Sequence, residues 1–164
     1  QGKYLIDAGH STTIYNGECV KISSGYVVGG NGSAANIVGV LNGIFFNAAT
    51  TLKPTFSNFY KATITPANSE DTTAFVIDDP FQQYVVSSDD ARTQAQFLAT
   101  YDMNSSAGSD TTGKSSSTLD TSETSADGKQ FRLIRSAEDP ENEDITAAFF
   151  SGVVVPNLNS FNQV

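Results

Sequence analysis

Tryptophan is absent from this 164-residue chain, and cysteine and histidine occur once each. The single cysteine, Cys19, excludes a disulfide within the chain and lies in an alternating stretch where a small buried apolar side chain is expected. One histidine, His10, and one cysteine cannot together close a structural zinc site. A Ser-His-Asp triad would have to use His10, and the G-x-S-x-G turn typical of that chemistry does not occur. We therefore expect no catalytic residue, no metal and no cofactor, and we do not expect an enzyme.

Positive charge is also scarce. Nine Lys and Arg residues stand against 18 Asp and Glu residues, which gives a net charge of −9. Nucleic-acid affinity comes from neutralised phosphates, so this balance argues against a nucleic-acid partner and equally against an anionic membrane surface. No run of 18 apolar residues occurs, so no membrane-spanning helix is expected.

What the chain does contain is short apolar runs rich in Val, Ile, Phe and Tyr, separated by Gly, Asn, Ser, Asp and Pro. Such runs predict strands, while no window keeps the spacing of an amphipathic helix beyond one or two turns near Asp89–Ala99. Ser23-Ser24-Gly25 predicts a tight hairpin turn. We predict an all-β fold, a single small β-barrel or β-sandwich domain. The expected strands are Glu18–Ser23, Gly25–Val28, Ile37–Ile44, Thr72–Ile77, Gln83–Val86, Gln96–Tyr101, Gln130–Arg135 and Ala148–Val155.

Two segments differ from the rest of the chain. Residues 104–129 include 13 Ser or Thr among 26 residues, which predicts a long surface loop region around one short edge strand anchored by Leu119. Residues 1–17 are mixed in polarity, and we expect an extended N-terminal arm that lies on a neighbouring molecule. The single β domain is then expected over residues 18–164.

Acidic clusters are the remaining candidates for chemistry. Asp78-Asp79-Pro80 follows an apolar run, and a turn at the end of a strand explains all three residues, because Asp bonds its own backbone in turns. The alternative is a pair of catalytic carboxylates. Glu138–Asp144 is the densest acidic cluster, but it lacks the glycine of an EF-hand loop and contains a proline. We expect a solvated loop there, with an irregular calcium site as the alternative.

A series of motifs resembles small virion proteins of marine and cyanobacterial tailed phages. Members of that group carry elements such as "VGVFNG", "KPTFSNYW", "AxVxDDPxxxFEVQ", "GxSxTGxSxxxLD" and "DPDNE" in this order. The resemblance spans about Ile37 to Asp144. In this chain the corresponding stretches read IVGVLNGIFFNAATTLKPTFSNFY, AFVIDDPFQQYVV, GSDTTGKSSSTLDTS and FRLIRSAEDPENED.

The resemblance implies a capsid decoration (cement) protein, or a head protein close to one. It implies a location on the capsid exterior of the virion, the major capsid protein as partner, and a homo-oligomer, for which we expect a trimer. The chain departs from the group where Phe59-Tyr60 replaces an aromatic pair with Trp, and where Tyr84-Val85-Val86 lacks an acidic residue. Residues 147–161 depart most. The alternatives are another virion component (a tail, collar or host-recognition subunit) or a β-sandwich carbohydrate-binding module.

Contact with a partner calls for apolar anchors, because a strongly acidic domain cannot rely on net charge. Two clusters are not required by a simple strand core. The alternative is that both clusters fold back and complete the core of their own domain. The candidate interface residues are Tyr4, Leu5 and Ile6 in the arm, and Phe56, Phe59 and Tyr60 in KPTFSNFY.

Overall fold

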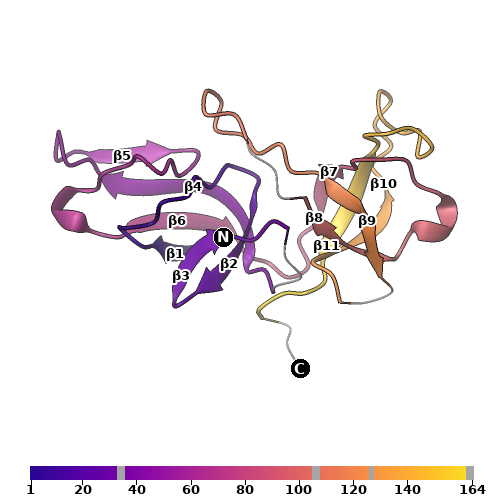
Figure 1. Ribbon diagram of the computed structural model, residues 1–164, viewed down its shortest axis with the longest axis horizontal. Coiled ribbons are helices and arrows are strands. Elements are labelled where there is room, and N and C mark those ends of the chain that lie inside the picture. The colour runs from indigo at the N-terminus through magenta and orange to yellow at the C-terminus, as the bar shows by residue number, and fades with distance from the viewer. Residues whose placement is uncertain (33–35, 105–107, 126–127, 162–164) are drawn as a thin grey trace. The chain divides into compact units, whose positions relative to one another are not determined.

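The chain folds into two compact units, each with its own antiparallel sheet (Figure 1). The computed structural model describes residues 1–32, 36–104, 108–125 and 128–161. Unit 1 comprises Gln1–Gly30, Val38–Asp79 and Ala107–Ser116, and unit 2 comprises Asn31–Ile37, Pro80–Ser106 and Ser117–Val164. The all-β prediction is confirmed. Where the sequence predicted one domain over residues 18–164, the chain forms two units, and neither sheet closes into a barrel over the described residues.

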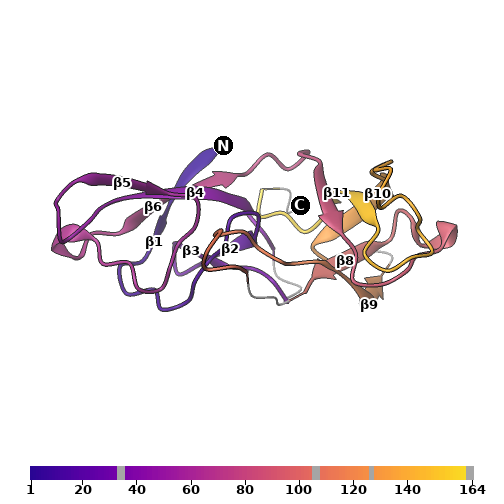
Figure 2. The ribbon, with the colours of Figure 1, turned by 90° about the horizontal axis from the view of Figure 1, so that it is seen from above.

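Unit 1 is built on a six-stranded sheet with the order β1-β6-β4-β2-β3, and β5 pairs with one end of β4 (Figures 1 and 2). The turn predicted at Ser23-Ser24-Gly25 joins β2 to β3, with positive φ at Ser24 and Gly25. Positive φ at both central positions suits the right-handed twist of a two-residue hairpin. The strands are β1 (Gly2–Ile6), β2 (Cys19–Ser23), β3 (Tyr26–Gly29), β4 (Gly39–Asn47), β5 (Pro54–Ser57) and β6 (Thr72–Ile77).

The N-terminal segment is part of this sheet and is not an extended arm. All five residues of β1 pair with β6, from Gly2 opposite Val76 to Ile6 opposite Thr72. Ile6 and Ile14 are both fully buried. The segment is therefore held by its own unit, because its apolar side chains complete the core beneath the sheet. That core comprises Ile6, Ile14, Val20, Val27, Val38, Leu41, Ile44, Tyr60, Ala74 and Val76.

Unit 2 is a five-stranded antiparallel sheet with the order β7-β11-β10-β8-β9. An isolated bridge pairs Ser88, which directly follows the edge strand β7, with Leu119, the first residue of the other edge strand, β9. The predicted edge strand in the Ser/Thr-rich segment is present as β9, with Leu119 buried; residues 105–107 and 126–127 of that segment lie outside the described residues. The strands are β7 (Tyr84–Ser87), β8 (Thr100–Met103), β9 (Leu119–Ser125), β10 (Phe131–Ser136) and β11 (Ser151–Pro156).

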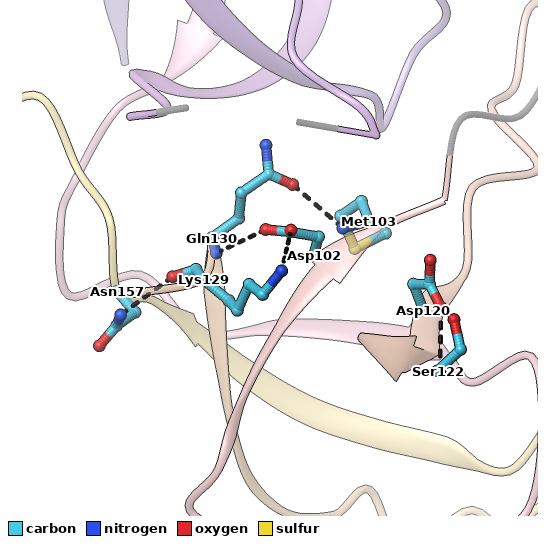
Figure 3. Close-up of polar contacts among 7 residues, drawn as sticks. All are labelled: Asp102, Met103, Asp120, Ser122, Lys129, Gln130 and Asn157. Atoms are coloured by element: carbon cyan, nitrogen blue, oxygen red, sulfur yellow. Dashed lines mark hydrogen bonds and ion pairs between the residues drawn. The ribbon is translucent and has the colours of Figure 1, made fainter. Parts of the chain in front are cut away.

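A buried polar network ties β8 to the start of β10 in unit 2 (Figure 3). The carboxylate of Asp102 accepts hydrogen bonds from Nζ of Lys129 at 3.0 Å and from the backbone N of Gln130 at 3.2 Å. The side-chain oxygen of Gln130 accepts from the backbone N of Met103 at 3.0 Å, and Asn157 Nδ2 donates to the carbonyl of Lys129 at 2.9 Å. Each of these contacts satisfies a polar group next to the core, so the network fixes strand placement.

Helix is confined to two short 3-10 turns among the described residues, Ala67–Ser69 and Gln94–Gln96. The second lies inside the predicted helical stretch Asp89–Ala99, where Thr93 N donates to the side chain of Gln96 at 2.9 Å. The expected strand Gln96–Tyr101 is shorter than predicted, because the 3-10 turn occupies its beginning and β8 starts only at Thr100. No helix in the described ranges has the length and apolar content needed to cross a membrane.

Candidate interaction surface

The sheet of unit 1 presents apolar side chains on both of its faces. Along β6, Ala74 and Val76 are buried in the core, while Thr73 and Phe75 alternate with them and point to the opposite face. An antiparallel sheet usually covers one face and leaves a polar face in water. Phe75 departs from that pattern, because it places a large apolar side chain on the face opposite the core.

Strand register collects further apolar residues on the same side as Phe75. Residues directly opposite each other in an antiparallel pair share a face. Thr73 lies opposite Leu5 of β1 and Phe45 of β4, and Phe45 lies opposite Phe56 of β5. We call the surface formed by Leu5, Phe45, Phe56 and Phe75 the outward face.

Within the outward face, the ring of Phe56 packs against the rings of both Phe45 and Phe75. The ring centroids of Phe45 and Phe56 are 4.9 Å apart with a tilt of 50°, and those of Phe56 and Phe75 are 6.3 Å apart and nearly parallel. Phe56 is 73 % exposed and Leu5 is 46 % exposed, whereas Phe45 and Phe75 are half-buried. A contiguous exposed apolar cluster on a strongly charged protein is typical of a contact surface.

A shallow groove opens beside the rings, with a volume of about 420 Å³. It lies where β4 carries a bulge, since the pairing with β6 shifts between Leu41 and Gly43. Gly43 lies opposite Phe75 and has no side chain to fill the space, and a glycine in a strand often marks such a close approach. The groove is lined by Gln1, Asn42, Gly43, Ile44, Phe56, Ser57, Asn58 and Phe75.

The groove lining carries no charged side chain, although the whole chain carries −9. Charged groups border the surface: Lys3 is exposed and lies opposite Phe75, and the N-terminal ammonium of Gln1 lies 3.4 Å from Asp78 Oδ1. A partner that approaches this surface therefore meets mainly apolar rings and neutral amides, bordered by Lys3 and by the ion pair of the Gln1 ammonium with Asp78.

Two of the six predicted interface residues lie on the outward face. Phe56 is its most exposed ring, and Leu5 lies at its β1 end. Sequence reasoning missed Phe45 and Phe75. The signal for Phe75 was its alternation with Ala74 and Val76 inside a correctly predicted strand, and Phe45 was missed because the predicted strand ended at Ile44 while β4 continues to Asn47.

Tyr4, Ile6 and Tyr60 point to the other side of the sheet, which corrects their assignment to an interface. Ile6 is fully buried and Tyr60 is 1 % exposed, so neither is accessible to a partner. The Tyr60 hydroxyl donates to the carbonyl of His10 at 2.9 Å. Tyr4 packs against the core and donates its hydroxyl to Asp78 Oδ2 at 2.8 Å. Burial and the neighbouring Asp78 carboxylate raise the pKa of Tyr4 to about 12.

Phe59 is half-buried and belongs to a separate contact. Its ring stacks on that of Tyr15, with centroids 5.9 Å apart and an interplanar angle of 4°. Gly113 packs against the same ring, because a Cβ at Gly113 would lie 2.4 Å from Cδ1 of Phe59. Phe59 therefore holds the Gly108–Ser116 loop onto unit 1 and does not extend the outward face.

The two acidic clusters lie at the end of a strand and in a loop, where hydrogen bonds hold several of their carboxylates. Asp78 and Asp79 directly follow β6, as predicted, and Asp78 is bonded to Tyr4. In the 138–144 loop, Asp139 accepts from the backbone N of Glu141 and Asp144 accepts from Thr146. Hydrogen bonds from the Thr146 hydroxyl and backbone hold the pKa of Asp144 below its usual value. No group of three or more His, Cys, Asp or Glu side chains in the described ranges is placed to hold a metal ion.

Comparison with protein-family models, with curated proteins and with solved structures finds no match to this chain.

Proposed function

We propose that the chain is a structural virion protein, a decoration protein that binds the outer surface of a phage capsid and stabilises the shell without catalysis. The observation that carries the proposal is the outward face, where Leu5, Phe45, Phe56 and Phe75 form one apolar surface on a protein that is otherwise strongly acidic. The resemblance of the sequence motifs to small phage virion proteins supports the same function. The partner is the major capsid protein, and the proposed location is the capsid exterior.

The contact works through burial of aromatic surface. Aromatic anchors at the centre of an interface contribute most of its binding energy, while the surrounding contacts exclude water. Each copy repeats the same contact on a symmetric shell, so a modest affinity per site is enough to cover the shell and resist its expansion. The net charge of −9 keeps free copies apart in solution until they dock.

The test is attachment to decoration-free capsids assembled from the major capsid protein encoded with this chain. Phe56→Ala together with Phe75→Ala is expected to weaken attachment about 30-fold or more, since each lost anchor costs about 1–2 kcal/mol or more. Phe81→Ala serves as the matched control, because Phe81 is 78 % exposed and belongs to unit 2. Equal attachment by the double variant and the control would overturn the assignment of this face.

A second candidate function is the binding of a neutral carbohydrate in the groove. The amides of Asn42 and Asn58 lie beside the rings of Phe56 and Phe75, and uncharged amides next to aromatic rings suit sugar hydroxyls and the apolar face of a sugar ring. A glycan array separates the two functions. Binding to a neutral saccharide that is lost in Phe56→Ala, without attachment to capsids, would favour the carbohydrate-binding function.

A further inference from the structure

A buried carboxyl group lies in unit 1, in the turn that precedes β2. Glu18 is only 7 % exposed, and its Oε2 accepts a hydrogen bond from the backbone N of Tyr15 at 2.9 Å. Its Oε1 occupies space left by Gly29, where a Cβ would come within 2.8 Å. Glu18 takes part in no ion pair within the described residues. An isolated buried carboxylate is costly, so its ionisation and its surroundings are coupled.

The Glu18 side chain closes a tight turn over Tyr15–Glu18. The backbone N of Glu18 donates to the carbonyl of Tyr15 at 3.1 Å, and Gly17 has φ of 83°. A positive φ at the third position of a turn favours glycine. The carboxyl oxygen that receives the Tyr15 N–H therefore adds a second bond across the same turn.

This turn supports the floor of the groove. Asn16 Nδ2 donates to the carbonyl of Asn42 at 2.9 Å, and Gly17 N donates to the carbonyl of Leu41 at 2.9 Å. Leu41 N in turn donates to the carbonyl of Glu18 at 2.9 Å. These bonds end at the β4 bulge that creates the groove, so the turn and the bulge hold each other in place.

The same turn also holds a wall of the groove. Asn16 N donates to the carbonyl of Gly113 at 2.8 Å, and Ser115 N donates to the carbonyl of Asn16 at 2.9 Å. The loop fixed in this way accepts a hydrogen bond at the Thr112 carbonyl from Nδ2 of Asn58, a residue that lines the groove, at 2.8 Å. If the turn opened, Asn42 would lose its hydrogen bond from Asn16, and the loop that holds Asn58 would lose its own bonds to Asn16. Two sides of the groove would then lose support.

We propose that protonation of Glu18 keeps this turn closed and the groove in its docking shape, so that the outward face binds its partner more tightly at mildly acidic than at alkaline pH. The inference rests on the proposed function for the docking step, but the turn can be followed without a partner. Burial raises the pKa of Glu18 to about 7. The hydrogen bond from Tyr15 N lowers this pKa, but by less than burial raises it. The neutral form therefore predominates below neutrality, and a buried charge appears above it.

Other titratable groups near the turn are few. β4 has no titratable side chain, and on β3 Tyr26 lies at the far hairpin end, opposite Ser23. The pKa of the Tyr15 hydroxyl is raised by its hydrogen bond to Asp110, and the pKa of Asp110 is lowered by the same bond, so both titrate away from neutrality. Cys19 is adjacent to Glu18, and Lys114 lies on the loop that the turn holds. Cys19→Ser is the control for the thiol.

Amide hydrogen exchange measured by NMR tests the turn. Protection factors, which are corrected for the intrinsic pH dependence of exchange, are followed at the amides of Tyr15, Asn16 and Ser115. We expect them to fall up to about tenfold between pH 6 and pH 8.5 in the wild type, because each pH unit between about 4.5, the pKa of the exposed carboxyl, and about 7, its pKa in the closed turn, favours the open turn by up to tenfold, and the effect levels off at higher pH. Glu18→Gln should show no such fall, while Cys19→Ser and Glu70→Gln, an exposed Glu of unit 1, should behave like the wild type. Constant protection in the wild type, or an equal fall in Glu18→Gln, would overturn the proposal.

Attachment to decoration-free capsids at the same two pH values tests the coupling. Wild-type attachment should weaken several-fold at pH 8.5, and attachment of Glu18→Gln should not change. A parallel loss in both proteins would contradict the coupling of Glu18 to docking. Absence of attachment by every variant at both pH values would overturn the proposed function, and the exchange measurement would still decide whether Glu18 controls the turn.

Discussion

The ammonium group of Lys129 lies 3.0 Å from Oδ2 of Asp102, at the edge of the unit 2 core where both side chains are largely buried. Asp102 also accepts from the backbone N of Gln130. The pair joins β8 to Lys129, two residues before the start of β10. It therefore links two strands that share only two register pairs, Phe131 with Tyr101 and Arg132 with Thr100. The polar contact thus supplements a short stretch of backbone pairing.

Replacing Lys129 by Met is expected to lower the free energy of unfolding by about 3 kcal/mol, because a buried carboxylate then loses its charged partner. Arg135→Met is the control, since Arg135 is exposed and its guanidinium donates to the carbonyl of the next residue, Ser136. Urea unfolding followed by circular dichroism measures both changes. Equal stability of the two variants would show that Lys129 is not needed by Asp102.

The pH dependence of stability provides a second prediction, on Glu18. Its pKa is about 7 in the folded chain and about 4.5 when exposed, so the folded state binds the proton more tightly. Stability from this group is therefore greatest in acid and decreases as the pH rises from about 4.5 through about 7. Glu18→Gln should remove this decrease and should be more stable than the wild type at pH 8 by up to about 3 kcal/mol.

Thermal unfolding at several pH values checks this second prediction. Glu70→Gln removes the same charge at an exposed position, so its stability should follow the wild-type pH profile. If Glu18→Gln keeps the wild-type slope between pH 5 and pH 8, the carboxyl is not buried in the way described.

A third prediction concerns the two glycines Gly113 and Gly25, which both have positive φ, of 71° and 89°. A Cβ at Gly113 would lie 2.4 Å from the Phe59 ring, whereas a Cβ at Gly25 would meet nothing within 4 Å. Gly25→Ala should cost about 1 kcal/mol from backbone conformation alone. Gly113→Ala should cost at least about 1 kcal/mol more, because the Tyr15–Phe59 stack must move. Chemical denaturation of the two variants measures the difference, and equal costs would argue against the packing of Phe59 on this loop.

Much of the fold was predictable from short-range pattern. Thr72–Ile77 was predicted with its bounds correct, because a short apolar run ends at the turn residues Asp78-Asp79-Pro80. The strand Gly2–Ile6 was not predicted, since its alternation of Lys3 and Leu5 with Tyr4 and Ile6 becomes meaningful only when β6 is placed beside it. The division into two units was also missed, because residues 108–116 return to unit 1 from a distant part of the sequence.

The candidate surface was only partly predictable for a related physical reason. KPTFSNFY contains both an exposed ring, Phe56, and a buried one, Tyr60, separated by four positions. Strand β5 ends at Ser57, so simple alternation no longer decides which way the next side chains point. The two rings can be told apart only from their strand partners. Phe56 pairs with Phe45 on the outward face, whereas Tyr60 pairs with Ile14 of the core.

The last prediction uses this contrast within one segment. Phe56→Ala should change the free energy of unfolding by less than about 1 kcal/mol, because most of the ring is already in water. Tyr60→Ala should cost about 3–5 kcal/mol, since it removes a fully packed ring and leaves the His10 carbonyl without its hydrogen-bond donor. Tyr60→Phe separates these two contributions and should cost about 1–2 kcal/mol. Urea unfolding measures all three variants, and a Phe56→Ala variant as unstable as Tyr60→Ala would place Phe56 in the core and remove the basis for the outward face as a docking surface.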